Sequence, residues 1–221
     1  MNHLICTKYT SILHLLDALV KHDASKTTDL IICSTRAEFL NEVLAQLDHH
    51  HASALGHEVE DGDADLPALP DSRHPLLSPT LFLLNASQHC RLVFCPTTTT
   101  LRGYLSSYTA DVSQPEVGNG QIVIVNHLRQ HQGTSEFTLQ GLSHTFASAV
   151  SAAHRTRRSL RLVELRDVGD HLDPNQGPGL WQAQVPLLST SIKIGDGGAS
   201  WGRRTVSVEK VASRWFRLES E

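Results

Sequence analysis

Three short apolar runs along the chain predict buried parallel strands. They occupy residues 30–33 (LIIC), 92–95 (LVFC) and 122–126 (IVIVN). Each run is continuous rather than alternating between apolar and polar residues, which is typical of a strand that has helices packed on both faces. Each run also ends in a polar turn that leads toward a helical pattern. The order of strand, turn and helix therefore predicts an α/β fold with a mostly parallel sheet.

The segments between these strands have apolar residues at helical spacing. Phe39, Leu40, Val43 and Leu47, for example, form one apolar stripe. Helices are predicted over residues 10–22, 36–48, 78–88, 101–108 and 135–154. Gly141 is unusual within the last of these, because glycine costs about 1 kcal/mol in a helix interior relative to alanine. Its presence predicts either close packing or a break in the helix.

The last third of the chain changes to a β pattern. Residues 159–165 alternate between apolar and polar or charged residues, and residues 203–218 contain spaced valines and a tryptophan. Alternation of this kind is typical of strands that have one solvated face. We therefore expect antiparallel strands near the C-terminus, added as an edge to the parallel core.

The composition fits one domain with an acidic insertion. Hydrophobic residues make up 40% of the 221 residues, enough for the core of a single domain, and the formal net charge is −4. Seven acidic residues and one basic residue fall within residues 48–78. Residues 49–75 are rich in His, Asp, Gly and Pro and show little periodicity. The predicted organisation is a single domain, residues 1–221, with a disordered acidic insertion at 49–75.

Targeting signals and cysteine usage favour an intracellular protein. No apolar stretch approaches the roughly 20 residues that span a bilayer. The N-terminal sequence MNHLICTKYT does not have the basic-then-apolar order of a signal peptide. The four cysteines do not make a disulfide framework in a chain of this size. We expect a soluble protein without a membrane partner, nuclear or cytoplasmic, with the nucleus favoured.

Motifs for nucleotide and ester chemistry are absent from the sequence. G-x-x-x-x-G-K-[ST], G-x-G-x-x-G and G-x-S-x-G do not occur. Cys33 and Cys95 lie at the ends of predicted strands, where α/β folds place their sites, and a helix start after Cys33 would lower the pKa of its thiol. The sequence identifies no base to accompany either thiol. A small α/β enzyme that uses Cys33 or Cys95 is one hypothesis, and a buried structural thiol is the other.

Histidines in the acidic segment raise the question of a metal site. Residues 49–51 are all histidine, and His57 lies near Asp61, Asp63 and Asp65. Both residue types bind zinc. Adjacent histidines in a flexible loop rarely hold a fixed coordination geometry, however, so we predict neither a metal nor a cofactor.

Two groups of arginines are candidate nucleic-acid contacts. Arg155, Arg157 and Arg158 come at the end of the long predicted helix, and Arg203 and Arg204 come near the last β segment. Residues 154–221 carry three more basic than acidic residues, which would allow contacts with a phosphate backbone. A solvated surface, or cations that complement a helix C-terminus, is the alternative interpretation.

The C-terminal half resembles the later part of a RecA-like ATPase core. The likeness is carried by residues 122–154, 158–168 (RSLRLVELRDV), 181–188 (WQAQVPLL) and 199–219 (ASWGRRTVSVEKVASRWFRLE). In that fold a hydrophobic strand ends in an acidic Walker B residue, and a loop, a helix, a strand and a β-hairpin follow. In element order the resemblance extends over residues 28–218. The chain is similar in length and order to fungal recombinase paralogs, such as Shu-complex subunits, and to the RecA-like subunits of Elongator, which lack ATPase motifs.

The resemblance implies a RecA-like domain that does not hydrolyse ATP. The Walker A lysine is absent, and Asn126 stands where the Walker B acid would be. The implied function is that of a non-catalytic accessory or assembly subunit in homologous-recombination DNA repair. Its implied partners are other RecA-like or recombinase-paralog subunits, and DNA. A scaffold subunit of a tRNA-modifying, Elongator-like complex is the alternative within this fold, and the cysteine enzyme is the alternative outside it.

Overall fold

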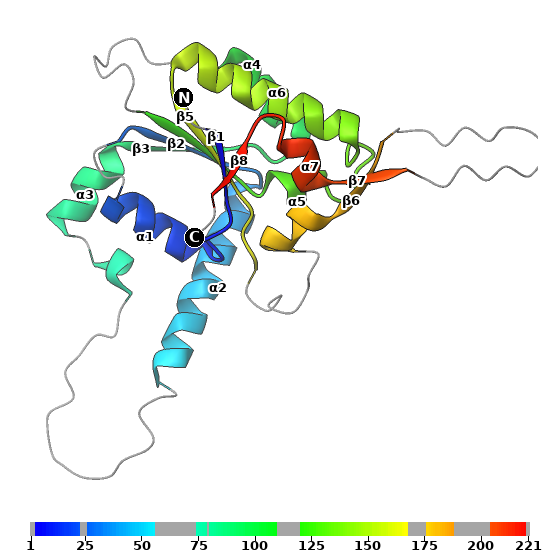
Figure 1. The fold of residues 1–221 in the computed structure, drawn as a ribbon. Coiled ribbons are helices and arrows are strands. Elements are labelled where there is room, and N and C mark those ends of the chain that lie inside the picture. Colours follow the sequence, from blue (N-terminus) through cyan, green and yellow to red (C-terminus); the bar gives the residue numbers. More distant parts are fainter. Residues whose placement is uncertain are drawn as a thin grey trace, which may run out of the picture.

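A six-stranded parallel sheet forms the centre of the protein, as a computed structural model shows (Figure 1). The model describes residues 3–22, 26–55, 74–78, 80–109, 120–167, 176–187 and 204–219. The strands are β1 (His3–Cys6), β2 (Thr28–Ile32), β3 (Cys90–Phe94), β4 (Gln121–Val125), β5 (Ser159–Val163) and β8 (Arg217–Glu219). Their order across the sheet is β3-β2-β4-β5-β1-β8, and every pairing is parallel.

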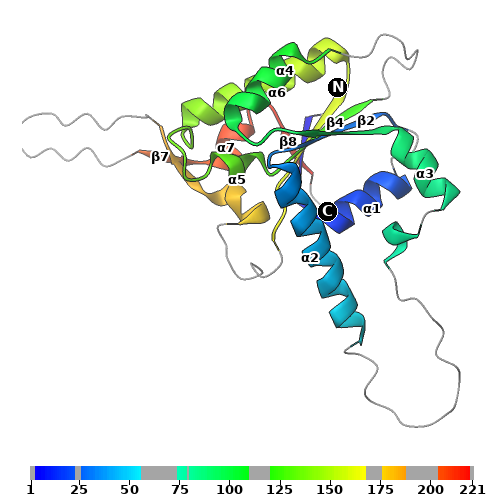
Figure 2. The same ribbon diagram turned by 180° about the vertical axis from the view of Figure 1, so that it is seen from behind.

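Helices cover both faces of this sheet (Figures 1 and 2). On one face lie α1 (Ile12–His22) and α2 (Arg36–Leu55), with the short η1 (Pro75–Leu77) and α3 (Leu81–Gln88) toward the β3 side. On the other face lie α4 (Thr98–Ser107), α5 (His127–His131), α6 (Leu139–Thr156) and α7 (Val208–Ala212). This division follows from the order of the strands. From β1 through β2 to β3 the chain moves toward one edge of the sheet, and after β3 it moves back toward the other edge. Because crossovers between parallel strands are right-handed, a reversal of direction moves the helices to the opposite face.

The core is correspondingly divided into two layers. Every residue of β2 and β4 is buried. Along β4, Ile122 and Ile124 pack with Phe146 of α6 on one face, whereas Val123 and Val125 pack with the α1 side on the other. Alternate side chains of a strand point to opposite faces, so a strand covered on both sides needs apolar residues at every position. The continuous apolar runs in the sequence are thereby confirmed as buried parallel strands.

The predicted α/β layout, a mostly parallel sheet flanked by helices with antiparallel strands toward the C-terminus, is confirmed, with differences at both ends of the chain. The first strand, β1, was not predicted, yet it lies inside the sheet between β5 and β8. The C-terminal antiparallel strands, β6 (Gln184–Pro186) and β7 (Thr205–Ser207), form a separate two-stranded sheet rather than an edge of the main sheet. The final strand, β8, pairs in parallel with β1.

Four short helical elements were also missed by the sequence analysis. They are α5, α7 and the 3-10 helices η1 and η2 (Gly177–Gln182), each of six residues or fewer. Elements this short contain fewer than two turns, so an apolar period cannot be recognised in them. None of the helices in the described ranges is long and apolar enough to cross a membrane.

The first part of the predicted acidic insertion, residues 49–75, is helical. Helix α2 continues through residues 49–55, so this part of the segment is helical rather than a loop. Histidine, alanine, serine and leucine are all tolerated in helices, and the first strong helix breaker after residue 36 is Gly56. Residues 56–73 lie outside the described residues, and His74 and Pro75 lead into η1.

Candidate functional site at the carboxyl edge of the sheet

A cleft lies at the carboxyl edge of the sheet, between the ends of β2, β4 and β5. Its volume is about 320 Å³, and α1, α2 and α5 complete its walls. The chain leaves β2 for α2 on one face and leaves the neighbouring β4 for α5 and α6 on the other face. Adjacent strands whose connections diverge in this way leave a crevice at their carboxyl ends, which is where open α/β sheets usually bind ligands.

The loop between β1 and α1 differs from a phosphate-binding loop in length, composition and packing. It spans only residues 7–11 and contains no glycine. Tyr9 is buried within it, in the apolar layer beneath the sheet, and its ring lies 5.4 Å from the ring of His14. The loop's lysine, Lys8, has its Nζ 3.4 Å from Glu219 Oε1. Phosphate loops instead use glycines and unpaired backbone N–H groups to surround the phosphate oxygens.

Asn126 at the end of β4 has a structural role. Its backbone is left-handed, with φ 59°, a conformation that asparagine adopts more readily than most residues. Its Oδ1 accepts a hydrogen bond of 2.7 Å from the backbone N–H of Leu165. The side chain therefore links the ends of β4 and β5, which agrees with a polar cap at this strand end.

Glu164, directly after β5, is a buried residue that the sequence analysis did not select. Its Oε1 accepts a 2.8 Å hydrogen bond from the N–H of Leu128, and its Oε2 accepts a 3.4 Å bond from the N–H of Arg129. The Nδ1 atom of His127 lies 2.8 Å from the same carboxylate. The carboxylate thus binds the first turn of α5, whose N–H groups have no partner within the helix. In the sequence, this arrangement was indicated by the polar pair Asn126-His127 directly after an apolar strand.

Charged side chains of both signs line the cleft. Glu38 on α2 accepts a 2.8 Å bond from the N–H of Thr35, while Thr35 Oγ1 accepts one from the N–H of Glu38. This reciprocal capping box starts the helix, and the bond from Thr35 lowers the pKa of the Glu38 carboxyl. On the opposite wall Arg129 pairs with Asp167. The cleft therefore contains charged groups of both signs, and Cys33 and Ser34 also line it.

The cysteines proposed as nucleophiles are buried. Cys33 and Cys95 are 6% and 2% exposed, and pairing of Ile32 with Phe94 places them on neighbouring strand ends. Burial raises the pKa of Cys33 well above its usual value, and the negative charge of Glu164 adds to this. Burial also raises the pKa of Cys95 to about 11. Both thiols are therefore protonated near neutral pH, which favours the structural interpretation.

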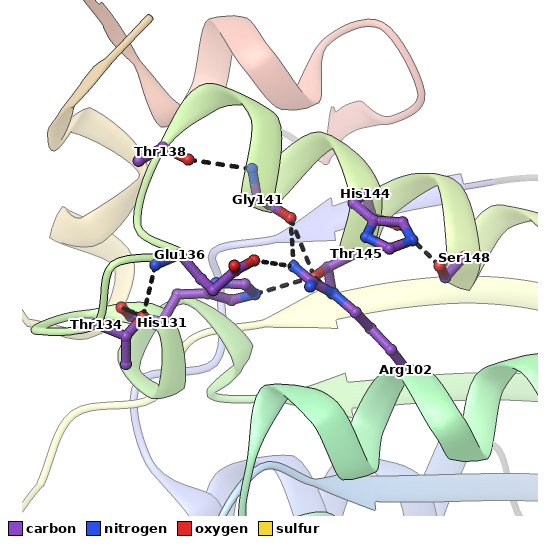
Figure 3. A network of polar contacts seen from close by, with 9 residues as sticks. All are labelled: Arg102, His131, Thr134, Glu136, Thr138, Gly141, His144, Thr145 and Ser148. Atoms are coloured by element: carbon purple, nitrogen blue, oxygen red, sulfur yellow. Dashed lines mark hydrogen bonds and ion pairs between the residues drawn. The ribbon is translucent and has the colours of Figure 1, made fainter. Parts of the chain in front are cut away.

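A polar network connects α4, α5 and α6 above the sheet (Figure 3). One guanidinium nitrogen of Arg102 donates to Glu136 Oε2 and to the carbonyl of Gly141, both at 2.8 Å. The Nε of Arg102 donates to Thr145 Oγ1, which is also 3.0 Å from His131 Nε2. A Cβ on Gly141 would lie 2.2 Å from the carbonyl oxygen of Glu136, so close packing explains this glycine. Burial, reinforced by the charges of His127 and Arg102, lowers the pKa of His131 to about 4.

Two of the five predicted arginines bind other parts of the fold. Arg155 donates to the carbonyls of Leu105, Ser106 and Tyr108, at 2.8, 3.1 and 3.4 Å, and so caps the end of α4. Arg158 pairs with the buried carboxylate of Asp29 at the start of β2, and the Tyr108 hydroxyl donates to the same oxygen. These contacts explain the two side chains without a nucleic acid.

The other predicted arginines are exposed or not described. Arg157 ends α6 with φ 54°, and its side chain has no polar partner within the described ranges. Arg204 is exposed next to β7, and Arg203 lies outside the described residues. The end of α6 and strand β7 are at opposite ends of the molecule in both views (Figures 1 and 2). The two arginine groups are therefore not brought together.

The histidine-rich segment shows one close pair. The rings of His50 and His74 lie 5.2 Å apart, edge to face. Within the ranges that the structure describes, no three His, Cys, Asp or Glu residues are grouped so as to hold a metal ion. The side chains of residue 51, His57, Asp61, Asp63 and Asp65 lie outside those ranges.

Comparison with known proteins gave no match: no family model, no curated protein and no solved structure is significantly similar to this chain. The functional conclusions below are therefore drawn from its own geometry and from the resemblance in element order described above.

Slow thiol chemistry is expected if the cysteines are structural. We predict that Cys33 and Cys95 react with a thiol-specific reagent near neutral pH only as fast as the protein opens, and that denaturant exposes all four cysteines at once. The measurement is the rate of reagent consumption by the wild type, Cys33→Ser and Cys95→Ser. A fast phase in the native wild type that disappears in one of these variants would restore the enzyme hypothesis.

The free energy of unfolding should fall in mild acid because of His131. Its native pKa of about 4 is below the usual 6.5, so between these values the unfolded chain binds a proton that the native state does not. Stability is full above pH 6.5 and decreases as the pH falls toward 4, by about 3 kcal/mol in total. Denaturant titrations across this range should show a smaller decrease for His131→Gln. Parallel curves for the two proteins would show that His131 is not the cause.

Arg158 and Arg157 provide a matched comparison of a buried and an exposed guanidinium. Arg158→Ala leaves the Asp29 carboxylate buried without its ion-pair partner, and we expect a loss of about 3 kcal/mol in the free energy of unfolding. Arg157→Ala should change it by less than about 0.5 kcal/mol. Chemical denaturation of both variants tests this, and equal effects would contradict the buried ion pair.

Proposed function

We propose that this protein is a non-catalytic RecA-like subunit that pairs with another RecA-like subunit. The observation that carries the proposal is the position of exposed apolar residues. Of eight large apolar residues that are exposed in the described ranges, seven belong to consecutive elements from α2 to β3, and the eighth is Leu218 on β8. The seven, named here the α2–β3 surface, are Leu40, Leu44, Leu77, Leu81, Phe82, Leu84 and Leu92.

The α2–β3 surface includes an edge strand of the sheet. Strand β3 pairs only with β2, so its outer side has no strand partner among the described residues. Helix α3 beside it contains no charged residue, and its Leu81 is 85% exposed. Phe39 of α2 packs against Phe94 of β3, with ring centroids 5.6 Å apart, which joins α2 to this edge. Apolar groups concentrated in this way mark surfaces that bind other proteins, since burying each large side chain contributes about 1.5–3 kcal/mol.

Several features of the carboxyl edge support a role without catalysis. The loop of residues 7–11 is without glycine and contains the buried Tyr9, and Lys8 is paired with Glu219. Asn126 is engaged with the backbone of Leu165. Within the described residues, the loop of residues 7–11 therefore offers neither the glycine-rich backbone donors nor the free lysine that bind the phosphates of ATP.

The resemblance to recombinase paralogs supports a partner from homologous-recombination repair, in the nucleus. Arg157 and Arg204 are then the candidate DNA contacts, because their side chains are exposed and bind no other described part of the chain. Arg155 and Arg158 stabilise the fold through their contacts with Leu105 and Asp29. They could bind DNA only if these contacts broke. Arg203 stays a candidate from the sequence alone.

The test is purification of the tagged protein from its native cells, followed by mass spectrometry. We expect the wild type to recover a RecA-like subunit in near-equal amount, and Leu81→Arg/Leu84→Arg to recover at least about tenfold less, because charged side chains would replace apolar contacts at the interface. Leu218→Arg is the matched control, since Leu218 is exposed and apolar but lies on the opposite edge strand.

Three outcomes would count against parts of this proposal. Equal recovery by the wild type and Leu81→Arg/Leu84→Arg would exclude the α2–β3 surface as the interface. Equal loss in Leu218→Arg would indicate general destabilisation. Recovery of tRNA-modifying subunits instead of recombinases would replace the repair function by the Elongator-like alternative while keeping the interface.

A further inference from the structure

Ser78 is the only serine or threonine in the sequence that directly precedes a proline. Of the nine prolines, Pro79 alone follows a residue with a hydroxyl group. Kinases of the proline-directed class recognise this pair, because their substrate site accepts a proline directly after the hydroxyl that receives the phosphate. Ser-Pro pairs are common in proteins, so the use of this one depends on its position in the fold.

The backbone and the hydroxyl of Ser78 are accessible to an enzyme. Ser78 ends η1 with φ −91° and ψ 114°, an extended conformation that residues before a proline favour. The residue is exposed, and its hydroxyl has no hydrogen-bond partner among the described residues. Its N–H donates to the carbonyl of Pro75 at 3.2 Å, and its carbonyl accepts a 2.8 Å bond from the N–H of Thr80. Kinases bind the segment that they phosphorylate in an extended conformation, which Ser78 already has.

The neighbouring hydroxyl groups are engaged in the fold instead. Thr80 Oγ1 accepts a 3.2 Å bond from the N–H of Leu83 and so caps α3. Ser87, near the other end of α3, donates to the carbonyl of Leu84 at 2.8 Å. Among the three hydroxyl residues within residues 75–88, Ser78 is therefore the one that can be modified without loss of a side-chain contact.

Ser78 lies within the α2–β3 surface. It directly follows Leu77 and comes three residues before Leu81, which are 47% and 85% exposed. A phosphate on a serine carries a charge of about −1.5 to −2 near neutral pH. Neither η1 nor α3 contains a charged residue that could pair with it. A partner that covers the apolar side chains would have to remove water from this phosphate, which is unfavourable.

The start of α3 tolerates an added negative charge. The helix begins at Leu81 and has no acidic residue in its first turn. The N-terminus of a helix is favourable for anions, because its first N–H groups have no acceptor within the helix. Phosphorylation of Ser78 should therefore leave the fold of the unpaired subunit intact while it changes the surface.

From these observations we propose that Ser78 is a phosphorylation site of a proline-directed kinase, and that its phosphate prevents binding of the partner at the α2–β3 surface. The kinase transfers the γ-phosphoryl group of ATP to Ser78 Oγ. The Oγ–P bond forms, the bond between the γ-phosphorus and the bridging oxygen breaks to release ADP, and the hydroxyl proton passes to a base of the kinase. The reaction takes place on the unpaired subunit. The effect on binding rests on the proposed function, whereas the modification itself does not.

The first experiment treats the full-length protein with ATP and a purified mitogen-activated protein kinase, and locates the phosphate by mass spectrometry. We expect about one phosphate per chain, on Ser78. Ser78→Ala should not be phosphorylated, and Pro79→Ala should react at least about tenfold more slowly. Ser151→Ala removes an exposed serine that no proline follows, and it should react at the rate of the wild type. Phosphate on other residues only, or an equal rate in Pro79→Ala, would overturn the site.

The second experiment repeats the purification from native cells with Ser78→Glu, whose carboxylate imitates the charge of the phosphate. We expect it to recover at least about tenfold less partner than the wild type, and Ser78→Ala to recover as much as the wild type. Ser151→Glu is the matched control, because Ser151 is exposed on α6, which lies on the opposite face of the sheet from α3 (Figures 1 and 2). Its recovery should equal that of the wild type.

The results distinguish failure of this proposal from failure of the interface. Loss of the partner in Leu81→Arg/Leu84→Arg but not in Ser78→Glu would support the interface and overturn the regulatory effect of Ser78. Loss in neither variant would overturn both the interface and its regulation, while the kinase reaction still decides whether Ser78 is a modification site. Equal loss in Ser151→Glu and Ser78→Glu would show a general effect of added charge and would also overturn the regulatory effect.

Discussion

The carboxylate of Glu164 holds together the edge of the sheet on which the rest of the site depends. It is buried at the end of β5, and it binds two N–H groups at the start of α5 and lies beside His127. His127 in turn lies 5.4 Å from the ring of Phe146 and 5.6 Å from that of Trp181, centroid to centroid. The Glu164 carboxylate thus fixes where the chain leaves β4 and, through His127, how α6 and η2 pack. Because a buried carboxylate without donors is costly, these elements are strongly tied to one arrangement.

The carboxyl edge and the β3 edge of the sheet differ in the side chains that they expose. At the carboxyl edge, side chains from the strand ends make hydrogen bonds with neighbouring backbone, as Asn126 and Glu164 do. At the β3 side, apolar residues such as Leu81 and Leu92 are exposed around an edge strand whose outer side has no strand partner among the described residues. A strand edge of this kind is normally covered or protected by charges in a monomeric protein. This contrast is the basis of the proposal that the protein binds another chain at the β3 edge.

Much of the fold could be predicted from the sequence because the signals were local. The run of residues 122–126 shows burial on both faces, and the stripe through Phe39 and Val43 shows a helix against a sheet. β1 was missed because HLIC has only four residues and two of them, His3 and Leu4, are only partly buried. Its neighbours in the sheet, β5 and β8, come more than 150 residues later in the chain. No local pattern reports such a pairing.

The site was less predictable because its contacts join distant residues. The sequence placed Arg158 among the exposed cations, but its partner Asp29 lies 129 residues earlier in the chain. Asp29 itself lies next to an apolar run, so the sequence did not single it out. Similarly, Glu164 fell within the predicted strand of residues 159–165 and was not selected. Its contacts depend on α5, a helix of five residues that is too short to be recognised from the sequence. The contacts of a charged residue can therefore be identified only once the fold shows whether its side chain is buried.

Helix α2 takes part in both the cleft and the exposed apolar surface. Successive residues of a helix are separated by about 100°, so Glu38 and Glu42 face one side while Leu40 and Leu44 face nearly the opposite side. The first pair lines the cleft, and the second pair is exposed at the α2–β3 surface. The cleft follows from the strand order, because the chain leaves β2 and β4 toward opposite faces of the sheet, so it is present here without a phosphate loop.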